Sequence, residues 1–492
     1  MILPRKQSLT PAGTALFAAA WVLARAKVQS ITIDEADSYL AYAANPNLTH
    51  WTASSNNHLL NSMLMRLSVT AFGASELSAR APALLGAALY LWAVWRLARN
   101  VARGSAVLEW ALVACMAFNP LVMDYLVAAR GYSLALGLLM AALALAAGGT
   151  ERPYRTGAAI SLCAALSVTA NWSFALADAA VVLLALARMA RGRRPGEWLR
   201  MAAACVAPGA AAALFLAGSV LATWPRGVLV WGTESLRDTF HGVAEASLYE
   251  LNPYLVNPPL LAFLERWNWL LFPLAGAILA WRIAAIARAR PPLSRLFSSG
   301  GWLAAGTLAL SLTAHWLLFR TMHLLLPKVR TAVYLVPLLA LVAGAAASVP
   351  LGSRLGRLSG RALTAALVAI GCHFLLCLRL TYFQEWRWDA DVGNVYEVLA
   401  RYNHRYGLTD IASSWRYAAA LNFYRDKSRR ETIPRLEPLK PPYPEGHQAY
   451  VVYYLQDQPF VEKNGLKVVY VGNVGSAAVA IRPEVEQGRQ AP

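Results

Sequence analysis

Three acidic residues stand close together near the N-terminus: Asp34, Glu35 and Asp37. The pattern predicts a short helix over 34–44, on which Asp34 and Asp37 point to similar azimuths and Glu35 is rotated by about 100°. Such carboxylates can serve as a general base toward a hydroxyl, or hold a divalent cation through oxygen ligands. A structural alternative is that Asp34 caps the helix and the acids complement its dipole.

Basic side chains far apart in the sequence could bind an anion. They are Arg130, His323, Lys328 and Arg330. Arg matches phosphate oxygens with a planar fork, and Lys supplies a point charge. Three further residues are candidates for contacts to a substrate: His58, Asp124 and Tyr132. His315 lies inside an apolar run, where a His is costly unless it faces a cavity or a partner.

The composition indicates a membrane protein. Of the 492 residues, 57% are hydrophobic and only 15% are charged, whereas a soluble domain carries about 25% charged residues. The net charge of +18 does not indicate nucleic-acid binding, because the basic residues recur between apolar runs instead of forming one face. The five cysteines lie in apolar runs without metal-ligand spacing, as small buried hydrophobic residues do.

Apolar segments long enough to cross a membrane position these residues. We predict eleven spans, at 11–31, 80–99, 105–123, 131–149, 157–172, 174–190, 199–222, 267–287, 301–319, 331–349 and 362–380. The first could resemble a signal peptide, but no small-residue cleavage site follows it, so it is an anchor. The fold class predicted is therefore an α-helical polytopic membrane protein.

Lys and Arg sort to one side of this map. The connections on the side of the N-terminus hold Arg5, Lys6, Arg96, Arg99, Arg103, Arg152, Arg155, Arg188, Arg191, Arg193, Arg194, Arg282, Arg288, Arg290, Arg295, Arg354, Arg357 and Arg361. The positive-inside rule places this side in the cytoplasm. The acidic cluster, the candidate anion-binding cations and the tail are then extracytoplasmic.

Two domains follow from the map: a transmembrane domain over 1–380, with outer loop helices within 34–72, and a soluble α/β domain over 381–492. The tail has helical periodicity at 391–405 and short β-rich runs at 449–455, 466–471 and 477–481. At the start of the second span, Glu76 and Arg80 are four residues apart and predict an ion pair.

Several landmarks occur in order on the predicted outer side. They are Asp34-Glu35 after the first span, His58-Leu59-Leu60, the segment Phe72-Gly73-Ala74-Ser75-Glu76-Leu77-Ser78-Ala79-Arg80-Ala81-Pro82, Ala129-Arg130-Gly131-Tyr132, and Leu326-Pro327-Lys328-Val329-Arg330. With them the chain resembles, over about residues 30–350, the bacterial lipid-linked-sugar glycosyltransferases of the C-type membrane fold. That group includes the protein O-mannosyltransferases and the aminoarabinose transferases of lipid A.

The resemblance implies a polyprenyl-phosphate sugar as donor, bound at the outer face of the bacterial cytoplasmic membrane. Asp34, beside Glu35, would accept a proton from an acceptor hydroxyl, and the sugar would be transferred in one step with inversion. The acceptor could be a lipid, a polysaccharide or a protein. The donor-phosphate ligands implied by the resemblance are Arg130, Lys328 and Arg330, and His323 is a further candidate from its outer position. The predicted substrate contacts are Asp37, His58, Asp124 and Tyr132. A divalent metal ion remains an open cofactor.

Two other functions compete with this one. A transporter or flippase of polyprenyl-linked lipids would also need many spans and an outer anion site, but it predicts paired internal repeats, and the sequence shows none. A membrane scaffold presenting the tail domain would leave the acidic loop and the outer cations without a joint role.

Overall fold

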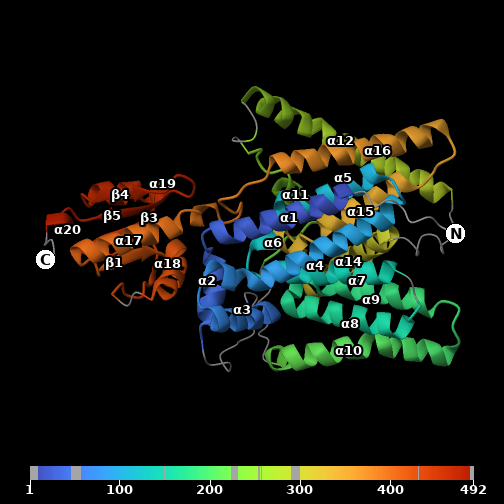
Figure 1. Cartoon of the computed structure of the whole chain (residues 1–492), viewed down its shortest axis with the longest axis horizontal. Helices are drawn as coiled ribbons and strands as arrows, with labels where there is room; N and C mark the ends of the chain where they lie inside the picture. The colour runs from blue at the N-terminus through green and yellow to red at the C-terminus, as the bar shows by residue number, and fades with distance from the viewer. Residues whose placement is uncertain are drawn as a thin grey trace.

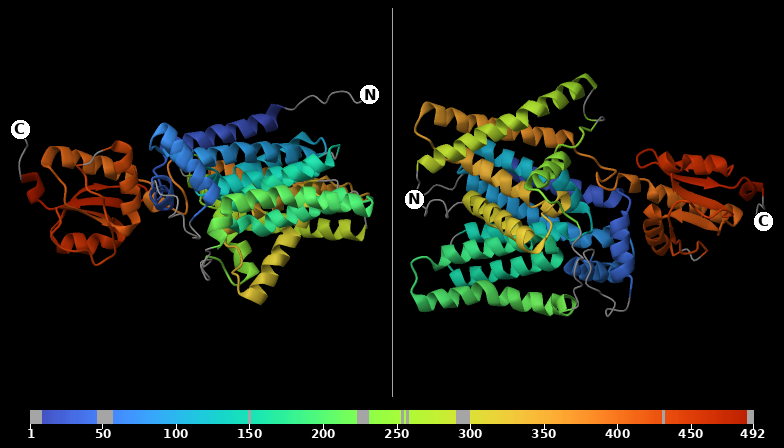
Figure 2. Two further views of the ribbon diagram at one scale, coloured as in Figure 1. Left: turned by 90° about the horizontal axis from the view of Figure 1, so that it is seen from below. Right: turned by 180° about the vertical axis from the view of Figure 1, so that it is seen from behind.

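The computed structural model describes residues 9–45, 57–148, 151–222, 231–252, 255, 258–289, 300–429 and 432–487. A bundle of helices forms the larger part, and a small α/β domain lies beyond one end of it (Figures 1 and 2). The first described helix, α1 (Leu9–Val28), begins at the opposite end of the bundle.

The long helices of the bundle coincide with the predicted spans. They are α1 (Leu9–Val28), α4 (Glu76–Ala102), α5 (Ala106–Ala117), α7 (Tyr132–Ala147), α8 (Pro153–Ala170), α9 (Ala175–Ala190), α10 (Pro195–Ala222), α12 (Pro258–Arg288), α14 (Gly300–Met322), α15 (Leu335–Ser348) and α16 (Arg354–Leu376). Three short 3-10 turns, η3 (Trp172–Phe174), η4 (Val329–Ala332) and η5 (Arg387–Asp389), lie between helices.

The predicted count of eleven spans is not confirmed. Within the described ranges, seven helices are long and apolar enough to cross a membrane, or nine if each of two bent pairs is one span. One pair joins α1 to the helices at 33–43 with a bend of 77°, and the other joins α5 to α6 (Pro120–Val127) with a bend of 59°. Helix α7 has only 16 residues, fewer than the roughly 20 that a straight span needs.

Small residues let α4 and α7 pack closely at the centre of the bundle. A Cβ atom on Gly86 would lie 2.4 Å from the backbone nitrogen of Leu134, and one on Gly137 would lie 2.5 Å from the carbonyl oxygen of Gly86. Only glycine fits at both positions. Small residues at a helix interface are the usual reason why two helices approach closely in membranes. The contact fixes the start of α7, and with it the turn that carries Arg130.

The elements at the other end of the bundle are shorter. Helix α2 (Ile33–Ser38) continues into a π-helical turn, η1 (Tyr39–Ala43), against which α3 (Leu59–Phe72) packs. Helix α11 (Leu236–Ser247) packs against α6 and η4. The helix predicted over 34–44 therefore forms, but its cap differs from the prediction. Thr32 is the N-cap, and its hydroxyl accepts from the Glu35 N–H while the Glu35 side chain accepts from the Thr32 N–H.

The C-terminal domain is a five-stranded mixed sheet with strand order β2-β1-β3-β5-β4. Its elements are α17 (Val392–Tyr406), β1 (Ile411–Ser414), α18 (Trp415–Ser428), β2 (Pro438–Leu439), β3 (Ala449–Tyr453), α19 (Tyr454–Lys463), β4 (Lys467–Val471), β5 (Ala477–Ile481) and α20 (Glu484–Gln487). Strand β1 pairs in parallel with β2 and β3, and β5 pairs antiparallel with β3 and β4.

This domain packs on the loop helices through one of its two apolar clusters. Residues of α17, α18 and one sheet face share that cluster with Ile31, Ala36 and Tyr39. The rings of Tyr39 and Phe423 meet edge to face at 5.0 Å. The acidic loop is thus held between the bundle and the C-terminal domain.

Candidate functional site

Asp34 lies in the first turn of α2, and the C-terminal domain helps to fix that turn. The Ile33 N–H donates to Oδ2 of Asp389 at 2.8 Å, and the Ile31 N–H donates to the Tyr424 hydroxyl at 3.1 Å. Asp389 is buried, and burial, with the neighbouring acids of the loop, raises the pKa of its carboxyl well above the ordinary value. The backbone on which Asp34 stands is therefore anchored by residues about 355 to 395 positions away.

Two arginines from separate turns converge on the Asp34 carboxylate. Oδ2 of Asp34 lies 3.3 Å from Nη1 of Arg330 and 3.6 Å from Nη2 of Arg130. Arg130 also donates to the carbonyl oxygen of Asp34 at 3.1 Å and to the Ser38 hydroxyl at 2.8 Å. The sequence predicted that these residues share a site, and the structure brings them together.

The turn before α7 needs glycine to present Arg130. Gly131 has φ +73°, and a Cβ atom there would lie 2.1 Å from the carbonyl oxygen of Ala170 and 3.0 Å from Cβ of His58. A side chain at this position would meet both strain and a backbone clash. Glycine allows Arg130, which is 2% exposed, to lie beneath the acidic loop.

Arg330 has two further partners that the sequence did not reveal. Its Nη1 lies 2.8 Å from Oε1 of Glu385, and its guanidinium carbon lies 4.4 Å from the centroid of the Trp231 ring. Glu385 also accepts a hydrogen bond from the Tyr125 hydroxyl. Burial raises the pKa of the Glu385 carboxyl, while Arg330 opposes that rise.

Glu35 occupies a different environment from Asp34. Its carboxylate accepts from Nε of Arg80 at 2.9 Å and from Nη2 at 2.7 Å, and also from the backbone N–H groups of Ala129 and Thr32. Both side chains are 0% exposed. Burial tends to raise the pKa of Glu35, but Arg80 and these donors outweigh it, so the pKa is lowered. With every oxygen engaged, Glu35 is placed to position the loop rather than to touch a substrate.

The predicted Glu76–Arg80 ion pair is wrong, because Arg80 turns inward to Glu35. Glu76 instead accepts from Nζ of Lys427 in the C-terminal domain, at 2.8 and 2.7 Å. Glu76 and Arg80 are indeed four residues apart on α4. The buried carboxylate of Glu35, from another segment, binds Arg80 in place of Glu76.

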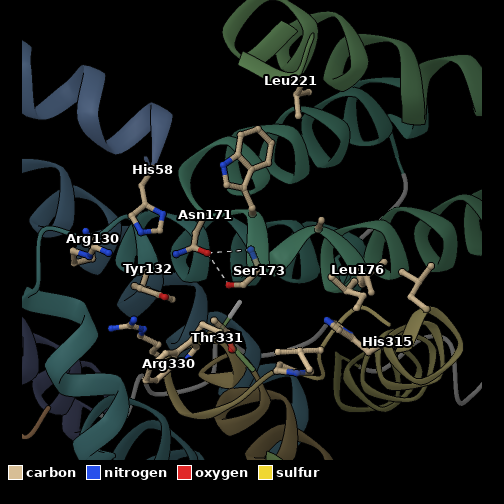
Figure 3. A pocket seen from close by; sticks show the side chains of 17 residues that line it. His58, Arg130, Tyr132, Asn171, Ser173, Leu176, Leu221, His315, Arg330 and Thr331 are labelled. Carbon is tan, nitrogen blue, oxygen red and sulfur yellow. Dashed lines mark hydrogen bonds between the residues drawn. The ribbon is translucent and has the colours of Figure 1, made fainter. Parts of the chain in front are cut away.

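A cavity of about 480 Å³ lies beside the arginines (Figure 3). At one end His58, Arg130, Tyr132 and Arg330 line it, and toward the other end lie Leu176 and His315. The rest of the wall is mainly apolar, with Ala175, Leu221, Leu318, Leu324, Leu325 and Pro327. The cavity therefore has a cationic end, and the rest of its wall is mainly apolar.

His58 faces the polar end as a neutral ring. Burial, followed by Arg130 and Arg330, lowers the pKa of His58 well below its ordinary value. Among the described residues neither of its ring nitrogens has a hydrogen-bond partner, and the ring lies 5.6 Å from that of Tyr132. His315 also faces the cavity, as its position inside an apolar run led us to expect.

Two predicted phosphate ligands lie away from this end. Lys328 and His323 are exposed, and neither lines the cavity. Lys328 lines a second cavity of about 400 Å³, together with Asp124, Trp231 and Glu385. Trp231 therefore borders both cavities.

Two predicted acids have other surroundings. Asp124 pairs with the buried Arg25 at 2.5 Å and accepts from the Gln384 N–H at 2.8 Å. Asp37 is exposed, and partial desolvation, followed by the Asp34 carboxylate, raises its pKa. Among the described residues, no three His, Cys, Asp or Glu side chains are grouped to hold a metal ion.

The comparisons with known proteins settle the family. The family described as "Glycosyltransferase family 87" matches residues 62–311, which is more than half of the chain. The chain belongs to glycosyltransferase family 87. This membership favours an enzyme over the transporter and scaffold alternatives. The family match includes Arg130, whereas Asp34 precedes it and Arg330 follows it.

Solved structures extend the likeness of this family 87 glycosyltransferase to its full length. The fold is similar to the crystal structure of ArnT from Cupriavidus metallidurans bound to undecaprenyl phosphate, with a TM-score of 0.52 and 12% identity over 97% of this chain and 98% of that one. The apo state of the same protein gives a TM-score of 0.48 at 14% identity, over 96% and 97%. None of the curated proteins compared matches the chain. The protein is therefore a multi-pass membrane glycosyltransferase with an ArnT-like fold.

Proposed function

We propose that the enzyme transfers a sugar from a polyprenyl-phosphate donor to an acceptor hydroxyl. The observation that carries the proposal is the contact of one carboxylate, Asp34, with Arg130 and Arg330, the two arginines that line the cationic end of a mainly apolar cavity. A lipid phosphate fits such a cavity, because cations stabilise its phosphate and an apolar wall can cover its hydrocarbon chain. The undecaprenyl phosphate in the ArnT structure is a ligand of the same chemical class.

In the proposed reaction, Asp34 accepts the proton of the acceptor hydroxyl as the hydroxyl oxygen attacks the anomeric carbon. The bond from that carbon to the phosphate oxygen breaks, and its electron pair leaves with the lipid phosphate. The configuration at the anomeric carbon is inverted, because there is one displacement. Arg130 and Arg330 neutralise the charge that develops on the leaving phosphate.

Other residues serve this step through binding and positioning. Neutral His58 and Tyr132 offer polar contacts to the sugar at the same end of the cavity. Glu385, which pairs with Nη1 of Arg330 at 2.8 Å, holds this arginine beside Asp34. Glu35 and Arg80 hold the loop that carries Asp34.

We place the reaction at the outer face of the bacterial cytoplasmic membrane, with the N-terminus in the cytoplasm and the C-terminal domain outside. The sorting of arginines supports this orientation, since they gather in the connections at the end of the bundle away from the C-terminal domain. The acceptor is left as a hydroxyl on a lipid, a polysaccharide or a protein.

Purified enzyme supplied with a radiolabelled polyprenyl-phosphate sugar and a membrane extract of acceptors tests the proposal. Asp34→Asn should lower transfer by about 10²- to 10⁴-fold, the usual contribution of a general base, while donor binding and the melting temperature stay near wild type. Asp37→Asn, the same change in the same helix outside these ion pairs, should lower transfer much less. Full activity of Asp34→Asn would remove Asp34 as the base.

A further inference from the structure

A third cavity, of about 710 Å³, lies at the end of the bundle away from the C-terminal domain. The turn from α4 to α5, the turn from α15 to α16, and the first part of α16 enclose it. Its cationic wall consists of Arg103, Arg282, Arg357 and Arg361. Among the described residues that line the cavity, none is acidic. The positive-inside rule explains arginines near this surface, but it does not require them to share a cavity.

Arg282 is the buried charge behind this cavity. The side chain is 0% exposed, and its donors go to uncharged oxygens, at distances of 2.6 to 2.8 Å: the carbonyls of Ala346, Gly356 and Val349 and the hydroxyl of Ser359. No carboxylate in the described part of the chain joins these contacts. Its charge thus lacks a carboxylate counter-ion among the described residues, and a buried charge without a counter-ion is unfavourable.

Glycine brings Arg282 close to α16. A Cβ atom on Gly360 would lie 3.0 Å from Nη1 of Arg282, so the guanidinium group packs directly on the helix. Arg357 and Arg361 stand one turn apart on that helix, and Arg357 donates to the Gly352 carbonyl at 2.8 Å. The cations on α16 are therefore near the buried charge and on the cavity wall.

The remaining wall is mainly apolar and suits a lipid chain rather than a free ion. It includes Val107, Leu108, Val349, Leu351 and Val368. Inorganic phosphate would use the arginines but would leave these side chains uncovered. A ligand with an anionic head and apolar chains uses both parts of the wall, and basic pockets on this side of membrane proteins bind such lipid headgroups.

We propose that this cavity binds the phosphate headgroup of an anionic membrane phospholipid, with its acyl chains along the apolar wall. The site lies at the opposite end of the bundle from Asp34, so it is separate from the donor site and goes beyond the proposed transfer reaction. The bound phosphate supplies the counter-ion that Arg282 lacks.

Native mass spectrometry of delipidated enzyme tests the site, with dioleoyl phosphatidylglycerol or dioleoyl phosphatidylcholine added to the detergent solution. The variant Arg357→Ala/Arg361→Ala should bind phosphatidylglycerol at least about tenfold more weakly, since each basic residue near a membrane surface is worth about 1 kcal/mol. The matched control is Arg152→Ala/Arg155→Ala, which removes two exposed cations from another connection on the same side, away from the cavity. Its affinity for phosphatidylglycerol should change less than about twofold.

A second variant keeps every charge and fills the cavity instead. Val107→Trp should also weaken binding of phosphatidylglycerol, and its melting temperature shows whether it folds. Equal losses in the two double variants would mean diffuse surface attraction and would overturn the site. Displacement of the lipid by millimolar inorganic phosphate, or equal affinity for phosphatidylcholine, would overturn the anionic phospholipid as its ligand.

Discussion

Two arginine–carboxylate clusters flank the acidic loop, and they differ in how completely they are closed. In the Arg80 cluster (Arg80 and Glu35) both side chains are 0% exposed, and Arg80 also donates to the carbonyls of Ala26, Gln29 and Ser30. In the Arg330 cluster (Asp34, Arg130, Arg330 and Glu385) Asp34 is 21% exposed and Glu385 27%. The first cluster leaves nothing for a ligand, whereas the second lies beside a cavity. Neighbouring acids in one sequence motif thus have different surroundings: Glu35 is enclosed, and Asp34 is left open for the role proposed for it.

We expect the largest effect of a substitution in the closed Arg80 cluster, and we expect it on stability. Glu35→Gln leaves the Arg80 charge buried without a counter-ion, which should lower the free energy of unfolding by about 3–5 kcal/mol. The melting temperature in detergent measures this. Glu76→Gln is the matched control, because its partner Lys427 is exposed, and it should cost less than about 1 kcal/mol. Equal losses would erase the distinction between the clusters.

In the Arg330 cluster, which is open to the cavity, a substitution should change the rate of sugar transfer more than the stability. Arg330→Ala should lower transfer by roughly 10²-fold and weaken donor binding, because it removes a cation from the developing phosphate charge. The melting temperature should change less than in Glu35→Gln. Lys328→Ala is the control: it removes an exposed cation two residues away and should have a small effect on turnover. A larger effect at Lys328 than at Arg330 would favour the sequence-based assignment of Lys328 as a phosphate ligand.

The smallest expected effect concerns the anchor between the loop and the C-terminal domain, and it depends on pH. Because the pKa of Asp389 is raised in the folded protein, the folded state holds its proton more tightly than the unfolded state. Stability should therefore fall as pH rises from the ordinary pKa of 3.8 through the raised value, and then level off.

The variant Asp389→Asn tests whether ionisation of Asp389 lowers the stability as pH rises. Asn keeps an oxygen that can accept from the Ile33 N–H but does not ionise, so the variant should melt higher than wild type at pH 8 and lose that advantage at the acidic end of its stable range. Asp410→Asn, on the exposed surface of the same domain, serves as the control. A larger advantage at acidic than at neutral pH would contradict the assignment.

Much of the fold could be predicted from apolar runs and charge sorting. The predicted spans coincide with helices, and the β-rich run at 477–481 is strand β5. Strands β1 and β2 could not be predicted, because they have only four and two residues and their pairing depends on distant partners. The count of eleven spans is not confirmed, because composition alone does not fix where helices bend or end.

In the candidate site, too, some residues could be predicted from the sequence and others could not. Asp34, Arg130, Arg330, His58 and Tyr132 were proposed from residue type and order, and the structure places them together. Glu385 could not be found that way, because it lies in an unpatterned connection and reaches Arg330 only through the return of the chain after α16. The i, i+4 rule named Glu76 as the partner of Arg80, because local spacing says nothing about a buried carboxylate from another segment. The sequence predicted Asp34 as the cap of α2, whereas Thr32 caps the helix through reciprocal hydrogen bonds with Glu35.

The anchoring of the Ile31–Ile33 backbone by Tyr424 and Asp389 has a consequence for biosynthesis. The ribosome makes the segment that carries Asp34 among the first elements, and it makes the residues that hold this segment among the last. An incomplete chain, although inserted in the membrane, would present Asp34 on an unsupported turn. We therefore expect transfer activity to appear only when the C-terminal domain has been completed.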